Sequence, residues 1–314
     1  MVLKILVGLP ACGKSTFANK LRVEENYLVY SSDKYRGRLG VDAPNNVVFD
    51  TLMRDLKASL LAGNSCVFDA LNLSRKRRKN IIRIVRDGFR KRGMTLRVEC
   101  ELFVVPTDIC IERNNLRANK KDVTDSVIIG KQSCFETPWY SDGFDEIHVH
   151  PIRVENLNFN RDSLDEFGQD NPHHTLTLGG HWRKAHNYIA EKYIFTESYP
   201  FLLEAIKYHD DGKFFTKEFR ESVGNATEVA HYYSHENVSA YLFLQRAFCL
   251  GIYESGTEYP LTDWGKLYVA NLINWHMRPR LWSNEKVKLK DESLLGEEMI
   301  KDLLILKEAD TYAK

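Results

Sequence analysis

The stretch Gly8-Leu-Pro-Ala-Cys-Gly-Lys-Ser15 decides the fold of the first half of the chain. It has the spacing G-x-x-x-x-G-K-S and lies between an apolar run, residues 3–8, and a helical stretch that starts near Lys14. In that context, backbone amides and a helix N-terminus point at phosphate groups. We therefore expect Lys14 to reach the β and γ phosphates of a nucleotide, and Ser15 to hold Mg²⁺.

Apolar runs continue to alternate with helical stretches after this loop. Runs at residues 65–69, 96–105 and 146–149 predict further strands, and this alternation indicates an α/β domain with a parallel sheet. The second half is different, because helical stretches follow one another at residues 182–192, 200–209, 226–250, 264–276 and 297–312. We predict a first domain at 1–152, a polar linker at 153–172 and an all-α domain at 173–314.

Composition limits the location and the partners of the chain. Its 314 residues carry a formal net charge of +1, so a polyanion would be attracted by local basic clusters only. The six cysteines form no C-x-x-C pair, and no run of about 18 apolar residues is present. We expect a cytoplasmic protein with reduced thiols and no membrane contact; the oligomeric state is not indicated.

Several charged residues follow the predicted strands of the first half. Asp33 can accept the proton of an attacking hydroxyl and Arg36 can bind a phosphate, although an N-cap aspartate with an exposed arginine fits equally well. Asp69 is the last residue of an apolar run, a position from which an acid would assist the metal ion of a bound nucleotide. The residues predicted to bind ATP and Mg²⁺ are Gly8, Ala11, Cys12, Gly13, Lys14, Ser15, Thr16 and Asp69.

Two groups of basic residues lie further along. The run at residues 75–79 is either a solvated helix face or a binding site for a nucleic-acid backbone. Arg113 and Arg117 are four residues apart, which places them on one helix face. Arginines on a lid would neutralise the charge that develops on a transferred phosphoryl group; an ordinary surface helix is the alternative.

Asn72, three residues after Asp69, adds to these motifs. In order and spacing, the motifs resemble the phage-type polynucleotide 5′-kinase family over residues 1 to 150. The resemblance implies that Asp33 is the general base for a 5′-hydroxyl and that Arg36 holds the acceptor. It also implies that Arg113 and Arg117 bind the donor phosphates of ATP. Related P-loop kinases share the early motifs and act on small molecules.

A second pattern occupies the helical half. His209 and Asp210 form an H-D-x-G-K sequence with Lys213, and adjacent His and Asp can ligate one metal ion. An ordered set of residues in this half resembles the HD phosphohydrolase superfamily, an all-α fold with one or two divalent metals. The set comprises His181, His209, Asp210, His235, His276 and Asp310. By that resemblance the metal ligands are His181, His209, Asp210, His235, His276 and Asp310, with Asp210 bridging. His186 and His231 are the alternatives to His181 and His235.

The resemblance also implies a reaction for this half. A metal-bound water would attack a phosphorus centre. Lys213 and Arg278 would bind the phosphate, although Lys213 can equally be a surface residue. Histidine and aspartate ligands are compatible with Mn²⁺, Fe²⁺, Co²⁺, Ni²⁺ or Zn²⁺.

Together the two halves predict a bifunctional end-healing enzyme. It would phosphorylate 5′-hydroxyl ends of RNA or DNA with ATP, and remove or open 3′-phosphate or 2′,3′-cyclic phosphate ends. No ligase motif is visible, so a separate ligase would seal the strand. The alternatives are a small-molecule or nucleoside kinase fused to a nucleotide phosphohydrolase, and a non-enzymatic module that binds nucleic acid under the control of ATP.

Overall fold

The computed structural model describes residues 1–40, 42–117, 123–172, 175–221, 223–250 and 261–314. Residue 173, where the second domain is predicted to begin, lies outside these ranges. The chain divides into two compact units. The first contains Met1–Lys131 and Pro138–Ile152, and the second contains Gln132–Thr137 and Arg153–Lys314.

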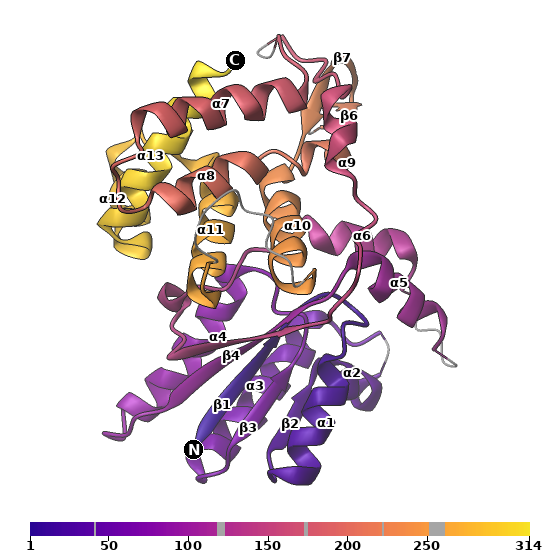
Figure 1. Cartoon of the computed structure of the whole chain (residues 1–314). Helices are drawn as coiled ribbons and strands as arrows, with labels where there is room; N and C mark the ends of the chain where they lie inside the picture. Colours follow the sequence, from indigo (N-terminus) through magenta and orange to yellow (C-terminus); the bar gives the residue numbers. More distant parts are fainter. Residues whose placement is uncertain (41, 118–122, 173–174, 222, 251–260) are drawn as a thin grey trace. The chain divides into compact units, whose positions relative to one another are not determined.

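The first unit is built on a five-stranded sheet whose paired strands are all parallel. The strands are β1 (Val2–Val7), β2 (Leu28–Ser31), β3 (Cys66–Asp69), β4 (Arg97–Val104) and β5 (Glu146–Pro151), in the order β2-β3-β1-β4-β5 (Figure 1). β3 and most of β1 and β4 are buried, as expected of a parallel sheet covered on both faces. The predicted α/β class is therefore confirmed.

Helices connect these strands. They are α1 (Lys14–Glu24), α2 (Ser32–Leu39), α3 (Asn45–Leu61), α4 (Arg75–Arg90), α5 (Thr107–Asn115) and α6 (Asp125–Gln132), with the 3₁₀ turn η1 (Tyr140–Asp142). The sequence prediction did not include α3. Its residues Val48, Leu52, Leu56 and Leu60 recur every four positions and are fully buried, so one apolar stripe packs against β2 and β3.

The parallel arrangement brings the predicted site residues to one edge of the sheet. Gly8 follows β1, Ser32 follows β2, and Asp69 is the last residue of β3. The carboxyl ends of parallel strands lie on the same edge, where ligands bind in open α/β sheets. The loop and the acidic residues are thus positioned together by the topology.

The second unit is mostly helical, as predicted. It contains η2 (Arg161–Asp165), α7 (Leu178–Lys192), α8 (Tyr199–Tyr208), α9 (Lys213–Thr216), α10 (His235–Cys249), α11 (Asp263–Trp275), η3 (Arg278–Leu281), α12 (Glu285–Leu295) and α13 (Glu297–Tyr312). α7 packs on α8 and α13, α8 on α11, and α10 on α11. The largely helical class is confirmed, with one exception in its middle.

The prediction of a single helix over residues 226–250 is wrong. β6 (Lys217–Arg220) and β7 (Ala226–Tyr232) form an antiparallel hairpin, and α10 begins only at His235. Ser234, at a φ of 59°, separates the strand from the helix. β7 contains Thr227 and Val229, whose β-branched side chains favour a strand.

The segment at 153–172, predicted as a linker, packs within the second unit. Leu164 is fully buried. The guanidinium of Arg161 donates to both oxygens of the Asp211 carboxylate, at 2.8 and 3.0 Å, and lies over the rings of Trp182 and Tyr208. These contacts attach the segment to the helices beside the predicted metal ligands.

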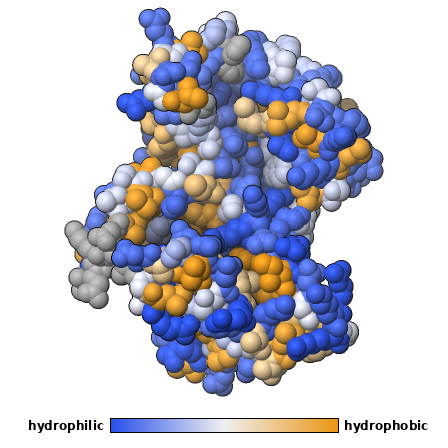
Figure 2. Space-filling model, turned by 180° about the vertical axis from the view of Figure 1, so that it is seen from behind, coloured by the Kyte–Doolittle hydropathy of each residue, from blue (hydrophilic) through white to orange (hydrophobic). Residues whose placement is uncertain are grey.

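Within the part of the chain that the structure describes, no helix combines the length and the apolar character needed to cross a bilayer. Hydrophilic residues predominate on the face shown in Figure 2, and hydrophobic residues occur there in separate groups.

Candidate functional sites

The phosphate loop connects β1 to α1 and has the conformation that the motif requires. Gly13, at a φ of 103°, is in the left-handed region that glycine adopts without strain, and α1 begins at the next residue. Lys14 is buried, and its ammonium donates to the carbonyl oxygens of Gly8 (3.0 Å) and Leu9 (2.6 Å). The lysine therefore lies across the loop, as a residue that binds phosphates there must.

Ser15 and Asp69 come together beside this loop. The Ser15 hydroxyl donates to the Asp69 carboxylate at 2.9 Å, although the two residues are 54 positions apart. A hydroxyl and a carboxylate are the oxygen ligands that Mg²⁺ takes beside nucleotide phosphates. The residues present thus fit a magnesium ion that neutralises charge on bound ATP.

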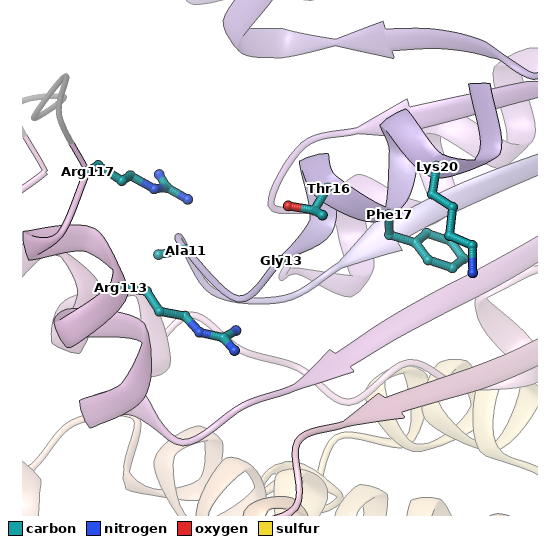
Figure 3. A pocket seen from close by; sticks show the side chains of 7 residues that line it. All are labelled: Ala11, Gly13, Thr16, Phe17, Lys20, Arg113 and Arg117. Atoms are coloured by element: carbon teal, nitrogen blue, oxygen red, sulfur yellow. The ribbon is translucent and has the colours of Figure 1, made fainter. Parts of the chain in front are cut away.

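Two cavities lie along α1. One, of about 520 Å³, is lined by Ala11, Gly13, Thr16, Phe17, Lys20, Arg113 and Arg117. The arginines reach toward the loop from the α5 side, and Thr16, Phe17 and Lys20 come from α1 (Figure 3). α5 ends at Asn115, so Arg117 lies past the helix that was predicted to carry both arginines.

The second cavity, of about 200 Å³, contains the predicted base. It is lined by Ser15, Asn19, Arg22, Val29, Ser31, Asp33, Lys34 and Asp69. Ser15 and Thr16, neighbours in the first turn of α1, therefore belong to different cavities. One cavity contains Arg113 and Arg117, and the other contains Asp33 and Asp69.

Arg36 is not among the residues that line the Asp33 cavity. Its guanidinium donates to Asn45 Oδ1 at 2.5 Å and to the carbonyl of Ala43 at 3.4 Å. The cations that do line this cavity are Arg22 and Lys34, which sequence reasoning missed. Arg22 lies seven residues after Ser15, so helical spacing from the loop could have identified it.

The basic helix α4 has a largely structural role in its first turns. Arg78 is fully buried and donates to Asp142 at 2.7 Å, and Arg75 lies 3.4 Å from the same carboxylate. Arg86 pairs with Asp145 at 2.8 Å. Two cations of the run at residues 75–79, which was predicted as a solvated face or a nucleic-acid track, are therefore paired within the first unit.

The six predicted metal ligands lie together in the second unit. His181 comes from α7, His209 and Asp210 follow α8, His235 begins α10, His276 follows α11, and Asp310 is on α13. All six are buried. Their donor atoms form two groups, His181, His209, Asp210 and Asp310, and Asp210, His235 and His276.

Asp210 belongs to both groups, with one oxygen in each. Its Oδ2 lies 3.3 Å from His209 Nε2 and 3.5 Å from His181 Nε2. Its Oδ1 lies 3.2 Å from His235 Nε2 and 3.6 Å from His276 Nε2. A carboxylate in this arrangement can bridge two metal ions.

The ring orientation of the histidines fits metal binding. Nδ1 of His209, His235 and His276 faces the carbonyl oxygen of the residue three positions earlier, at 2.7 to 2.8 Å. A carbonyl only accepts, so Nδ1 carries the proton and Nε2 presents a lone pair. Nε2 of His235 and Nε2 of His276 then face each other at 3.2 Å. Facing lone pairs beside a carboxylate are acceptors that a metal ion would satisfy.

Charge in this cluster shifts the pKa values of its members. Burial lowers the pKa of His209, but Asp210 and Asp310 outweigh it and raise that pKa to about 10. Burial raises the pKa of Asp310, but hydrogen bonds with His181 and His209 hold it well below its usual value. The carboxylates are therefore ionised, as metal ligands must be, and a metal ion that binds His209 must displace the proton that they hold on its ring.

The alternative ligands lie elsewhere. His186 is outside both groups; burial lowers its pKa, and its ring meets Trp182 edge to face. His231 is on β7, with its ring stacked on Tyr233. The structure therefore brings together His181 and His235, rather than these two.

A cavity of about 480 Å³ opens beside this cluster. Its lining comprises Asn171, Lys213, Ala230, His231, Tyr232, Tyr233, His235, Met277, Arg280, Lys307, Thr311 and Lys314. Lys213 is buried, and its ammonium lies 2.6 Å from Asp210 Oδ2 and donates to Gln169. Four cations line the cavity, so it suits an anionic ligand.

The predicted phosphate-binding role of Arg278 does not fit this geometry. Its guanidinium donates to the buried Asp291 carboxylate at 2.6 and 3.3 Å, and it does not line the cavity. Arg280 does line it, and lies 3.3 Å from Asp310. Both arginines belong to η3, whose tight turn the sequence alone did not indicate.

Gly212 holds the His209–Asp210 segment against α10. A methyl group there would overlap the carbonyl oxygen of His235 and lie 2.8 Å from the backbone nitrogen of Ser239. Gly212→Ala is therefore expected to destabilise the second unit by about 1–3 kcal/mol and to displace its metal ligands. Urea unfolding and the content of bound divalent metal measure the two effects.

The control is Gly130→Ala, on α6, because an added methyl group meets no atom within 4 Å there. This variant is expected to keep the wild-type metal content and to be as stable as the wild type or slightly more so. Equal metal contents in Gly212→Ala and the wild type would contradict the prediction.

One model of a known protein family matches most of the first unit. Residues 3–138 match the family model described as AAA domain. The matched AAA domain spans the phosphate loop, Asp33, Asp69, Arg113 and Arg117, and implies ATP and Mg²⁺ as ligands of the first unit. None of the curated proteins matches the chain.

Two solved structures are similar to part of the chain. They are a "putative kinase" from Chloroflexus aurantiacus J-10-fl, with 15% identity and a TM-score of 0.36, and a gluconokinase from Sinorhizobium meliloti 1021, with 13% identity and a TM-score of 0.34. Each similarity covers 48% of this chain, and 84% and 82% of the respective structures. Similarity at this level carries no information about the substrate.

Proposed function

We propose that the first unit transfers the γ-phosphoryl group of ATP to the 5′-hydroxyl of a nucleic-acid strand. The observation that carries this proposal is the pair of cavities beside the phosphate loop. The cavity with Arg113 and Arg117 suits the phosphates of ATP, and the cavity with Asp33 suits an acceptor hydroxyl. Such a division is what an in-line transfer between two bound substrates requires.

In this reaction Asp33 accepts the proton of the attacking hydroxyl. The hydroxyl oxygen bonds to the γ-phosphorus, and the bond to the bridging oxygen of the leaving ADP breaks. Lys14, Arg113 and Arg117 bind the phosphates and oppose the charge that develops on them. Arg22 and Lys34, rather than Arg36, are positioned to hold a phosphate of the acceptor.

For the second unit we propose a metal-dependent phosphohydrolase that removes 3′-phosphate or opens 2′,3′-cyclic phosphate ends. A divalent metal would supply a water activated at neutral pH and stabilise charge on the phosphorus centre. Asp210, which belongs to both groups of predicted ligands, would help to hold the metal, and Arg280, Lys307 and Lys314 would bind the substrate phosphate. A separate ligase would then join the healed ends.

One observation favours a second candidate, a kinase for a small hydroxyl compound or nucleoside joined to a nucleotide phosphohydrolase. Arg75, Arg78 and Arg86 are paired with aspartates of their own unit, which reduces the charge that α4 can offer to a strand. The Asp33 cavity, at about 200 Å³, also fits a small acceptor.

An assay with γ-labelled ATP and Mg²⁺ separates these candidates. The acceptors are 5′-hydroxyl RNA, 5′-hydroxyl DNA, nucleosides and small sugars, tested with the whole chain. Label in the oligonucleotide supports the polynucleotide reading, and label only in a small acceptor supports the second candidate. Oligonucleotides with 3′-phosphate or 2′,3′-cyclic phosphate ends, incubated with Mn²⁺, test the second unit separately; unchanged ends would contradict its proposed activity.

A further inference from the structure

The lining of the cavity in the second unit includes two chemically different groups of residues. Arg280, Lys307 and Lys314 are cationic, as is Lys213, and Arg280 lies against the predicted metal ligand Asp310. His231, Tyr232 and Tyr233 are aromatic and come from the end of β7 and the residue after it. A phosphate needs the cations only, so the aromatic residues have no role in the function proposed above.

The three aromatic residues are not equivalent. The Tyr232 hydroxyl donates to the carbonyl of Gln169, and its ring lies near the Lys213 ammonium, so Tyr232 supports the site itself. His231 and Tyr233 are two positions apart, which places them on the same side of an extended chain. Their rings are parallel within 1°, with centroids 5.5 Å apart, and Tyr233 is 40% exposed.

This pair lies close to the proposed reaction centre along the chain. Tyr233 is two residues before His235, whose Nε2 is 3.2 Å from Asp210 Oδ1 and which lines the same cavity. A cavity of about 480 Å³ is within the range that holds a nucleotide-sized ligand. A phosphate at the metal ligands would therefore leave the attached nucleoside within reach of the aromatic pair.

We propose that His231 and Tyr233 form a stacking platform for the base of the nucleotide that carries the phosphate. The substrate of this site is then a nucleoside phosphate ester, free or at a strand end, rather than any phosphate ester. Aromatic side chains stack on every base, so the platform selects for the presence of a base and not for its identity. The inference rests on the proposed phosphohydrolase activity of the second unit.

The test compares substrates with and without a base. Adenosine 3′-monophosphate and adenosine 2′,3′-cyclic phosphate are paired with glycerol 2-phosphate and glycerol 1,2-cyclic phosphate, which carry no ring to stack. We expect the ratio of kcat/KM for the adenosine ester to that for the glycerol ester to fall about tenfold in Tyr233→Ala, through KM. Tyr233→Phe restores the ratio, and His231→Ala lowers it in the same direction.

Tyr140→Ala is the matched control, because Tyr140 belongs to the first unit and is also 40% exposed. Its ratio is expected to equal that of the wild type. An unchanged ratio in Tyr233→Ala, or equal losses on both classes of ester, would overturn the platform.

A binding measurement separates failure of the platform from failure of the proposed activity. If the wild type hydrolyses none of the four esters, the phosphohydrolase proposal fails. Equilibrium dialysis then compares the binding of adenosine 3′-monophosphate with that of inorganic phosphate. The protein used carries Lys14→Ala, which weakens the other nucleotide site, and the comparison tests the platform. Preference for the nucleotide that Tyr233→Ala abolishes supports it, and a preference that survives this change refutes it.

Discussion

Asp210→Ala is expected to lose bound divalent metal and to lower the proposed phosphohydrolase activity of the second unit by about a thousandfold. The physical reason is that Asp210 supplies one oxygen to each group of predicted ligands, so its removal weakens both positions. It also leaves Lys213 without the carboxylate that lies 2.6 Å from its ammonium. Metal content after dialysis and release of phosphate from 3′-phosphate ends measure the two losses.

Asp263→Ala is the control for this substitution, because Asp263 is an exposed residue at the start of α11 and outside both ligand groups. It is expected to keep wild-type metal content and activity. Label transfer by the first unit is expected to be unchanged in both variants, since its site residues all belong to the other compact unit. An Asp210→Ala protein that retains metal and hydrolytic activity would contradict the assignment of the centre.

Asp33→Ala is expected to lower transfer of label from ATP to an acceptor hydroxyl by about 10² to 10⁴, the usual contribution of a general base. ATP affinity is expected to stay near that of the wild type, because Asp33 lines a different cavity from the one that contains Arg113 and Arg117. Single-turnover label transfer and equilibrium binding of ATP measure these quantities separately.

Asp50→Asn, an exposed change on α3, is the control for Asp33→Ala. The counterpart on the donor side is Arg113→Ala, which is expected to weaken ATP binding as well as transfer. If Asp33→Ala instead lost ATP binding while its rate at saturating ATP was unchanged, Asp33 would belong to nucleotide binding and not to proton transfer.

Local sequence signals were sufficient for most of the fold. The phosphate loop is a contiguous motif, and the strands it implies begin and end close to the predicted positions because apolar runs are read directly from the sequence. The hairpin of β6 and β7 was missed since its stability depends on cross-strand pairing, which a helical pattern over residues 226–250 conceals. Gly224 and Asn225, a turn dipeptide between the two strands, were the available signal.

Among the site residues, too, sequence signals identified some and missed others. The predicted metal ligands came from the resemblance of their ordered motifs to a known superfamily, with two histidines left open, and the structure brings these six residues together. The role of nearby cations depends instead on partners far away in the sequence. Arg78 is committed to Asp142, 64 residues later. Arg278 donates a hydrogen bond to Asp291, whereas Arg280 lines the cavity. Which of the two arginines faces the cavity depends on the turn of η3.

The hydrogen bonds from the three Nδ1 atoms to carbonyls three residues earlier have a consequence for stability. In the neutral imidazole they fix the proton on Nδ1, and in each ring they leave Nε2 facing the carboxylate of Asp210. A divalent ion that binds the folded unit more tightly than the unfolded chain then adds RT ln(1 + [M]/Kd) to the free energy of unfolding. With such binding, the free energy of unfolding of the second unit would rise with the free metal concentration, and that of the first unit would rise with the nucleotide concentration.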